Sequence, residues 1–253
     1  MLAPERHRRI LNLLTSQESV RTIDLARLFK VTEETVRRDL EKLDADGELV
    51  RTHGGAIRSS ENRRDLPLTS RETMNVVEKQ SIARHALKSI TEGETILLDA
   101  SSTAFELAVL LPDIRLTVLT NGLKIALELA TRPAMQVVLV GGSLNTSSLS
   151  CVGPLSDQIL ASHNIEKAFL SCRGIDAKRG LSEANEQHAH LRRRIIALSQ
   201  ETCLLADHSK LGLKSSFFFA SLTDIDYLIT DRKPAPAFRA AIKRAGVKLQ
   251  TVS

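Results

Sequence analysis

The sequence lacks the features that mark a secreted or membrane-embedded protein. Its three cysteines, Cys151, Cys172 and Cys203, are far apart and form no CxxC pair, so neither a disulfide framework nor a cysteine zinc site is predicted. No apolar run approaches the roughly 20 residues that span a bilayer. The N-terminus "MLAPERHRRI" has no apolar segment before a small-residue cleavage site. We therefore expect a cytoplasmic protein with no membrane partner, no metal and no cofactor.

A strong excess of charge is also missing from the N-terminal segment. The chain of 253 residues has a net charge of +5, which is compatible with binding to nucleic acid but does not require it. Residues 1–60 contain eleven Lys and Arg against ten Asp and Glu. Any prediction of DNA binding must therefore depend on where the arginines lie. The length allows one or two domains with a sizeable core.

Three helical patterns precede residue 50. Their apolar residues recur at helical spacing: Ile10, Leu13 and Leu14; Leu25, Ala26 and Phe29; Val36, Leu40 and Leu43. Thr22 and Thr32 suit the N-cap positions of the second and third helices. The third helix leaves Arg37 and Arg38 on its outer face. Two helices joined by a short turn, the second with an exposed basic face, are typical of a helix-turn-helix.

A small hairpin is predicted directly after the third helix. "DADG" ends that helix, with Gly47 suited to the left-handed C-cap conformation. "ELVRTHGGAI" then contains two short strands, with Gly54-Gly55 supporting a tight turn. A helix-turn-helix followed by a hairpin is a winged helix. The third helix can enter a major groove, while Arg51 and His53 lie against neighbouring phosphates.

An alternative for this segment is a solvated helix face held by charge pairs such as Arg37–Glu41. The tight turn and the wing favour DNA binding over it. We predict a DNA-binding domain over residues 1–57 and a linker over 58–75. The residues predicted to contact DNA are Thr22, Thr32, Thr35, Arg37, Arg38, Lys42, Arg51 and His53.

Strands and helices alternate in the predicted second domain, residues 76–253. The expected strands cover residues 95–99, 116–120, 136–142, 167–172, 202–207, 226–231 and 248–252. Apolar runs separated by helices predict an α/β fold with a Rossmann-like parallel sheet. The "FFF" at 217–219 suits either the core or a subunit interface.

Polar residues follow the predicted strands repeatedly, at the edge where parallel sheets bind ligands. "DASST" follows the first strand, and Lys210 follows the strand that ends at Asp207. Small hydroxylated residues at a helix start expose amide and hydroxyl donors to an anion, and a lysine adds a mobile cation. These patterns favour a small molecule that carries a phosphate. Each serine or threonine also suits a simple helix cap, and Gly141-Gly142 suits a simple turn.

Two sets of motifs carry a resemblance to a known family. "VTEETVRRDLEKL" and "RTHGGA" resemble the N-terminal signature of the DeoR family of bacterial sugar-metabolism regulators. "LLDASSTAFELAVLL", "LTNGLKIALEL", "AFLSCRGIDAKRGLSEANE" and "LLADHSKLG" resemble its sensor domain. The resemblance implies a fold similar to ribose-5-phosphate isomerase and binding of a phosphorylated sugar. It implies that Ser101, Ser102 and Thr103 hold the phosphate, and that Asp99, Asn121, Gly142, Asp176 and Lys210 line the pocket.

The chain departs from the family pattern at two places. Ser101 stands where the phosphate loop often has a glycine, which takes positive φ more freely. Gln187, His188 and Arg192 stand where many members have two glutamates and a lysine. We therefore assign recognition of the sugar hydroxyls to Glu183, Asn185 and Glu186. We expect His188 and His190 on the surface, and the basic run 191–196 on a solvated or subunit-contacting face.

The sequence thus predicts a DNA-binding transcriptional regulator rather than an enzyme, with no catalytic residues. We expect a repressor of a carbohydrate-utilisation operon that is relieved by a phosphorylated sugar, and that binds its double-stranded DNA operator as a homodimer or homotetramer. The alternative is an enzyme like a sugar-phosphate isomerase with a DNA-binding appendage, for which Asp99 and Asp176 are the candidate bases.

Overall fold

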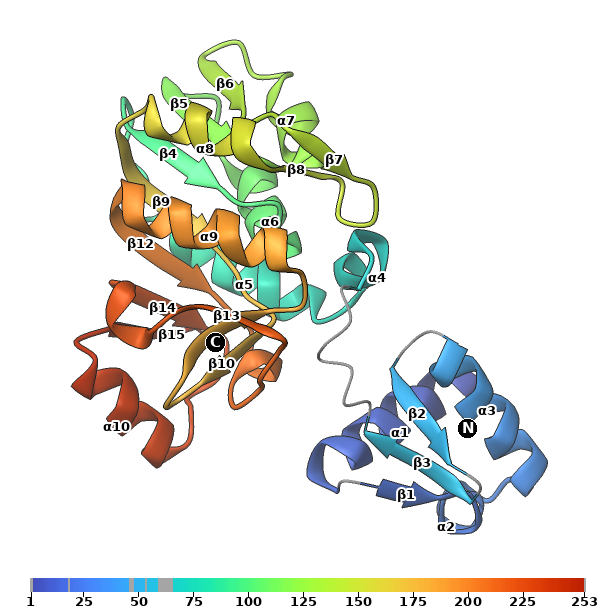
Figure 1. Ribbon diagram of the computed structural model, residues 1–253. Helices are drawn as coiled ribbons and strands as arrows, with labels where there is room; N and C mark the ends of the chain where they lie inside the picture. The colour runs from blue at the N-terminus through green and yellow to red at the C-terminus, as the bar shows by residue number, and fades with distance from the viewer. Residues whose placement is uncertain (1, 18, 46–47, 53, 59–65, 253) are drawn as a thin grey trace. The chain divides into compact units, whose positions relative to one another are not determined.

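The computed structural model describes residues 2–17, 19–45, 48–52, 54–58 and 66–252 (Figure 1). The chain divides into two compact units, residues 1–63 and residues 64–253. Within the described residues, no helix is both long enough and apolar enough to cross a bilayer.

The first unit is a winged helix. Its elements are α1 (Ala3–Ser16), β1 (Ser19–Arg21), α2 (Thr22–Phe29), α3 (Glu33–Ala45), β2 (Leu49–Thr52) and β3 (Gly55–Arg58). The predicted apolar faces meet in one core, where Ile10, Leu25 and Val36 are buried. Strand β1 was not predicted; it pairs with β3 and completes an antiparallel sheet in the order β1-β3-β2.

The two predicted helix caps differ in outcome. The Thr32 hydroxyl accepts a hydrogen bond from the Thr35 amide at 3.2 Å, which confirms it as the cap of α3. The cap at Thr22 is wrong, because α2 begins at Thr22 and Arg21 holds the N-cap position. The Thr22 amide instead donates to the Gly54 carbonyl at 2.9 Å, which ties the start of α2 to the wing. Gly47 lies outside the described residues.

A glycine is required where the wing meets β1. A Cβ atom on Gly55 would lie 2.0 Å from the Val20 carbonyl oxygen. The "GGA" sequence therefore does more than make a turn, because it allows the backbones of β1 and β3 to approach.

The second unit is built around a parallel sheet in the order β15-β14-β12-β9-β4-β5-β6. Its strands are β4 (Thr95–Leu98), β5 (Leu116–Thr120), β6 (Met135–Leu139), β9 (Ile165–Leu170), β12 (Ser199–Leu205), β14 (Tyr227–Thr230) and β15 (Lys248–Thr251). All seven match predicted strands. Central strands such as β4 are apolar because they are buried on both faces, whereas the edge strands β6 and β15 are partly exposed.

Helices cover both faces of this sheet (Figure 1). They are α5 (Val76–Leu87), α6 (Ser102–Leu110), α7 (Leu123–Leu129), α8 (Pro154–Ala161), α9 (Glu186–Leu198) and α10 (Pro236–Arg244). Ile82 of α5, Leu107 of α6 and Ile125 of α7 pack in the core layer on one face. Leu160 of α8 and Ile195 of α9 pack on the other.

Several short elements were not predicted. Strands β10 (Gly174–Asp176), β11 (Gly180–Glu183) and β13 (Phe217–Ala220) form an antiparallel sheet, and β7 (Ser143–Asn145) pairs with β8 (Ser150–Val152). Two short 3-10 helices, η1 (His208–Lys210) and η2 (Leu222–Asp224), complete the unit. The "FFF" run forms most of β13, where Phe219 joins the core and Phe217 is exposed.

The segment 58–75 is not a linker throughout, as the sequence had suggested. It contains helix α4 (Leu68–Thr73), and both Leu66 and Leu68 are buried. The Leu68 amide donates to the Ser147 carbonyl at 2.8 Å. The prediction was wrong here because six residues are too few to show a helical period.

Candidate functional sites

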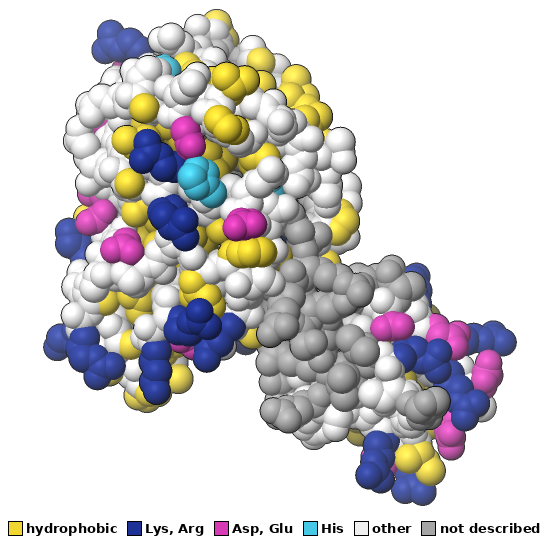
Figure 2. All heavy atoms as spheres, in the orientation of Figure 1, with side chains coloured by type: hydrophobic (Ala, Val, Ile, Leu, Met, Phe, Trp, Pro, Cys, Tyr) yellow, Lys and Arg dark blue, Asp and Glu magenta, His cyan; other side chains and the backbone are white. Residues whose placement is uncertain are grey.

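Helix α3 presents an exposed basic face opposite its buried apolar residues. The Arg37 and Arg38 side chains are 54% and 78% exposed, and Lys42 is exposed beside them. Acidic and basic side chains intermix over this unit in Figure 2. Among the described residues, Arg37 pairs with Glu33 rather than with Glu41 as predicted. Its Nη2 lies 3.8 Å from Glu33 Oε2. Such exposed pairs are weak, so a DNA phosphate can replace the glutamate.

The wing is joined to α3 by charged contacts. Arg51 Nη1 lies 2.8 Å from Glu41 Oε1, and the Arg51 amide donates to Asp44 Oδ1 at 3.2 Å. These contacts place the wing arginine beside the basic face of α3. His53 lies outside the described residues. Thr22 is buried, so its side chain is not presented with the other predicted DNA contacts.

A buried ion pair holds α3 against α1. Arg6 Nε donates to Asp39 Oδ2 at 2.7 Å, and His7 Nε2 lies 2.9 Å from Asp39 Oδ1. Burial alone would raise the pKa of the Asp39 carboxyl, but the hydrogen bonds from Arg6 and His7 outweigh it and hold that pKa below its usual value. Sequence reasoning missed this contact, because partners more than 30 residues apart share no local pattern.

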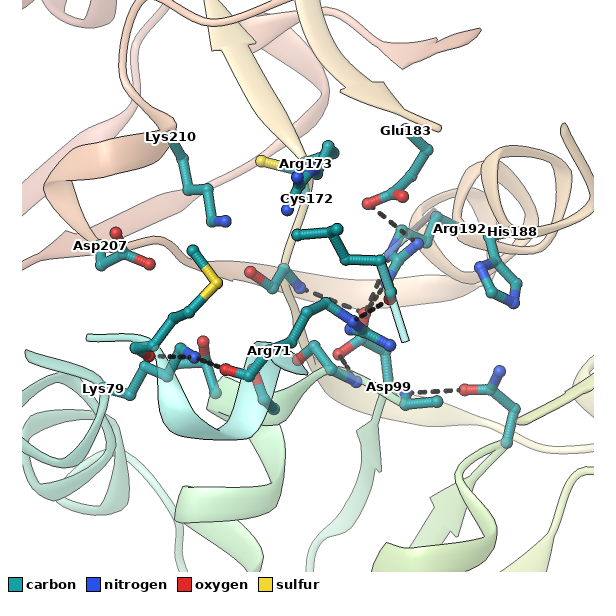
Figure 3. A pocket seen from close by; sticks show the side chains of 18 of the residues that line it. Arg71, Lys79, Asp99, Cys172, Arg173, Glu183, His188, Arg192, Asp207 and Lys210 are labelled. Atoms are coloured by element: carbon teal, nitrogen blue, oxygen red, sulfur yellow. Dashed lines mark hydrogen bonds and ion pairs between the residues drawn. The ribbon is translucent and has the colours of Figure 1, made fainter. Parts of the chain in front are cut away.

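The second unit contains a charged cavity at the carboxyl edge of its parallel sheet (Figure 3). Most of the predicted effector residues meet there: Asp99, Ser101, Ser102, Thr103, Asn121, Glu183 and Lys210. Residues that the prediction had not assigned to the site also line it, among them Arg71, Asn75, Lys79, Arg173, Arg192 and Asp207.

Two predicted effector residues lie outside the lining of this cavity. Gly142 has φ +137°, and a Cβ there would lie 2.5 Å from the Val152 carbonyl oxygen, so this glycine serves close packing. The Asp176 carboxylate accepts the amides of Lys178 and Arg179 and pairs with Lys214 at 3.2 Å. It therefore stabilises the turn that follows β10.

Asn185 and Glu186 are likewise absent from the cavity lining. The Asn185 side chain caps α9 by accepting the His188 amide at 3.2 Å, and Glu186 is exposed. Of the three residues predicted to read sugar hydroxyls, only Glu183 lines the cavity.

The start of α6 offers backbone donors to the cavity. Ser101 Oγ accepts the Ala104 amide at 3.1 Å, so its hydroxyl acts as a helix cap. The amides of Ser102 and Thr103 donate to no other described residue, and both residues line the cavity. Ser101 itself has φ −88°, so the glycine common in the family is not needed for this backbone. Amides at a helix start, with its dipole, suit an anion.

The Asp99 carboxylate, which lines the cavity, is held by hydrogen bonds and by an ion pair. One carboxylate oxygen accepts the Ser101 amide at 3.2 Å. The other accepts the Ser171 amide at 3.2 Å and the Arg192 guanidinium at 2.8 Å. The carboxylate thus connects the ends of β4 and β9 to α9.

Arg192 bridges two carboxylates inside the protein. Its guanidinium also pairs with Glu183 at 3.2 Å (Figure 3). Burial alone would lower the pKa of Arg192, but Glu183 and Asp99 raise it above its usual value. The expectation that the run 191–196 is a solvated or subunit-contacting face is wrong at Arg192, which faces inward from α9.

His188 is also buried, contrary to the surface position predicted for it. Its Nε2 lies 3.0 Å from Ser150 Oγ and 3.2 Å from Ser148 Oγ. Burial, and then the Arg192 charge, lower the pKa of His188 to about 3, so the ring is neutral. His190, in contrast, is exposed and pairs with Asp157.

Two lysines, Lys79 and Lys210, line the cavity on either side of Asp207 (Figure 3). Burial lowers the pKa of Lys210, although Asp207 opposes that shift. Burial, and then the charge of Lys210, lower the pKa of Lys79 to about 8. The cavity therefore concentrates positive charge that an anion would stabilise.

Three of the missed residues, Arg71, Asn75 and Lys79, carried no usable signal in the sequence. They recur at a spacing of four, but they do not share a helix, because α4 ends at Thr73 and α5 begins at Val76. Their position before the first predicted strand hid their connection to a site formed at the sheet edge.

Glu78, His208 and Asp231 form a further polar group near the cavity. Their potential ligand atoms lie within 4.8 Å of one another. His208 Nδ1 is 2.7 Å from Asp231 Oδ2, which a histidine–carboxylate pair explains without an ion.

Comparison with known proteins matches both units. Residues 6–62 match the DeoR-like helix-turn-helix domain, and residues 74–232 match the DeoR C terminal sensor domain. The chain is 42% identical over 252 residues to the uncharacterized HTH-type transcriptional regulator YulB of Bacillus subtilis, covering 100% of this chain and 98% of that protein.

Other relatives are named as a repressor or as an activator of transcription. The transcriptional repressor GlcR of Bacillus subtilis is 34% identical, over 98% of this chain and 96% of its own length. The L-fucose operon activator of Haemophilus influenzae is 36% identical, over 88% and 90%. Among solved structures, ribose 5-phosphate isomerase A of Methanocaldococcus jannaschii aligns with a TM-score of 0.41 and 16% identity, over 54% of this chain and 55% of that chain.

Proposed function

The chain belongs to the DeoR family of transcriptional regulators, and from that premise we propose that it represses a carbohydrate-utilisation operon until a phosphorylated sugar binds its sensor unit. The helix-turn-helix supports binding to DNA. The regulated genes, the direction of control and the effector are the parts that we propose.

The charge of the cavity is the observation that carries the effector proposal. Five cationic side chains line it (Arg71, Lys79, Arg173, Arg192 and Lys210), against three carboxylates (Asp99, Glu183 and Asp207). A formal excess of two positive charges matches a phosphate monoester, which carries about −1.5 to −2 at neutral pH. The amides of Ser102 and Thr103 supply neutral donors for the same group.

The rest of the ligand would be read by side chains with remaining hydrogen-bonding capacity. Asn121 is occupied, because its amide accepts from the Ala100 amide and donates to the Cys151 carbonyl. Asp99 is occupied as described. Glu183, which Arg192 holds in place at 3.2 Å, is therefore our candidate for the sugar hydroxyls, while Asp99 and Asn121 position the loop.

DNA recognition is proposed for the exposed face of α3 together with the wing. Arg37 and Arg38 are the candidates for base or phosphate contacts, with Thr35, Lys42 and Arg51 beside them. We propose repression because the relative GlcR is named a repressor, whereas the fucose relative is named an activator. Because such proteins usually bind paired half-sites, we propose a homodimer or a homotetramer, acting in the compartment that holds the DNA.

A thermal-shift screen tests the effector class. Ligand at 100 times its Kd stabilises a protein by about 2.7 kcal/mol, which for a unit of this size raises Tm by roughly 5–11 °C. We expect this shift with one or more phosphorylated sugars and not with the same sugars lacking phosphate. Equal shifts from both sets would show that the phosphate group is not recognised.

The enzyme alternative loses both of its candidate bases. Asp99 is held by two backbone amides and by Arg192, and Asp176 lies outside the cavity lining. The relatives described above are named as regulators of transcription. The chain is therefore a regulator and not an isomerase.

A further inference from the structure

Helix α4 forms one side of the effector cavity. Leu66, Arg71, Met74 and Asn75, from the segment around this helix, all line the cavity. Only residues 59–65 separate this segment from Arg58, the last residue of the wing. The same short stretch of chain therefore contributes to the ligand site and leads directly into the DNA-binding unit.

The segment is attached to the sensor unit at points on three separate elements. Leu68 is hydrogen-bonded to Ser147 at 2.8 Å. Glu72 pairs with Lys124 of α7 at 2.5 Å. The Asn75 amide group donates to Asp207 Oδ1 at 3.0 Å, at the cavity edge. These polar contacts add to the burial of Leu66 and Leu68 in holding the segment.

Lys79 holds the end of α4. Its ammonium donates to the carbonyl oxygens of Arg71 and of Met74, the latter at 2.6 Å. Carbonyls at a helix end lack partners within the helix and carry its negative dipole, so a buried cation there stabilises the docked helix. The ammonium itself lines the cavity (Figure 3).

We propose that α4 transmits the occupancy of the cavity to the DNA-binding unit, an inference that rests on the proposed function. Arg71 contacts the bound phosphate ester, and Lys79 holds the helix in place. The guanidinium of Arg71 lies in the cavity region beside Asp99 and Arg192 (Figure 3), and its Nε donates to Leu66 within the same segment. Arg71 can thus approach an anion only while the segment is docked.

This arrangement supplies the unequal binding that a regulatory ligand needs. A ligand shifts a conformational equilibrium only if it binds one state more tightly than the other. The donors at the start of α6 and Lys210 are present whether or not α4 is docked. Arg71 is present only in the docked state, so an anion favours docking of α4.

Hydrogen exchange of the full-length chain tests the proposal, with inorganic phosphate as the probe and chloride of equal ionic strength as the reference. We expect phosphate to slow exchange at the start of α6 and also across residues 66–79. In Arg71→Ala, protection should persist at α6, which shows that the variant is folded, and should disappear across 66–79. Arg115→Gln, an exposed arginine outside the cavity lining, should behave like the parent chain.

The possible results separate this inference from the proposed function. Protection at α6 without protection across 66–79 overturns the role of α4 and leaves the phosphate site intact. If phosphate protects neither place, both the role of α4 and the phosphate site are excluded. A second readout is the ratio of operator Kd in phosphate to operator Kd in chloride. In the parent chain this ratio should be about fivefold or more above or below one. In Arg71→Ala and in Lys79→Met it should be about one.

Discussion

The two basic regions of this protein use arginine in opposite ways. On α3, Arg37 and Arg38 stand mostly in solvent and pair with glutamates at 3.6–4.0 Å. In the sensor unit, Arg192 is buried and its contacts with Asp99 and Glu183 measure 2.8 and 3.2 Å. Exposed pairs are screened and exchangeable, whereas a buried pair is a fixed part of the structure. The comparison teaches that an arginine's partner and burial, rather than its presence in a basic run, indicate its role.

Removing the buried arginine should give the largest effect. Arg192→Met leaves two buried carboxylates without their cation, which should lower the free energy of unfolding by about 3–5 kcal/mol. Arg194→Met on the same helix is the control, because Arg194 is partly exposed and 3.9 Å from Asp157, and it should cost about 1 kcal/mol or less. Urea denaturation followed by circular dichroism measures both. Equal losses would contradict the distinction between buried and exposed arginine.

Removing a cation that lines the cavity should act on ligand binding instead. Lys210→Ala should weaken binding of a phosphorylated sugar by about 1.5–3 kcal/mol, the usual contribution of a charge-assisted hydrogen bond. Ser102→Ala should reduce the inducer response more mildly. Isothermal titration with the sugar phosphate found by the thermal-shift screen measures these changes. Asp176→Asn should leave the affinity unchanged, because Asp176 lies outside the cavity lining. A weaker affinity in this variant would show that Asp176 belongs to the site.

The exposed arginines of α3 should affect DNA binding in one of two ways. If Arg37 or Arg38 contacts a guanine in bidentate fashion, its change to alanine should cost about 1–3 kcal/mol and relax one base position. If it contacts a phosphate, the salt slope should fall by about one unit. Gel-shift titrations at several salt concentrations distinguish the two. Arg9→Ala, similarly exposed on α1, is the control, and an effect no larger than that of Arg9→Ala would remove α3 from the DNA interface.

The smallest predicted effect is a pH dependence of effector affinity. Lys79 has a pKa of about 8 in the absence of ligand, and a bound anion would favour its charged form. Affinity should therefore be highest below pH 8 and fall above it by at most about tenfold per pH unit for one proton. The phosphate group is already a dianion in this range, because its second pKa is about 6.

A conservative variant isolates the contribution of Lys79 to this dependence. The charged groups around Lys79 are Arg71 of α4, Glu106 of α6, and Asp207 and Lys210 after β12. Lys79→Arg stays charged up to high pH, so its affinity should fall less steeply above pH 8. Any remaining slope would report Lys210, whose pKa is also lowered. Identical slopes in both proteins would exclude Lys79 as the titrating group.

The sequence alone determined the order of the main elements. The apolar faces of α1, α2 and α3 and the apolar runs in the parallel strands are local patterns, with periods that depend on backbone geometry. The same patterns placed "DASST" and Lys210 at the ligand-binding edge of the sheet. The motif resemblance then predicted the family, and the domain matches confirm it.

Only the tertiary structure decided which polar residues share the cavity. The sequence suggested a surface position for His188 and a solvated or subunit-contacting face for the basic run that contains Arg192. Helix α9 instead turns Arg192 inward onto Asp99 and His188 onto Ser150 of β8. Arg71 belonged to a stretch without a clear period, and yet it lies on α4 and lines the cavity at the sheet edge. The physical reason is that the partners of a buried charge are supplied by segments tens of residues away, and no local periodicity records which segments will meet.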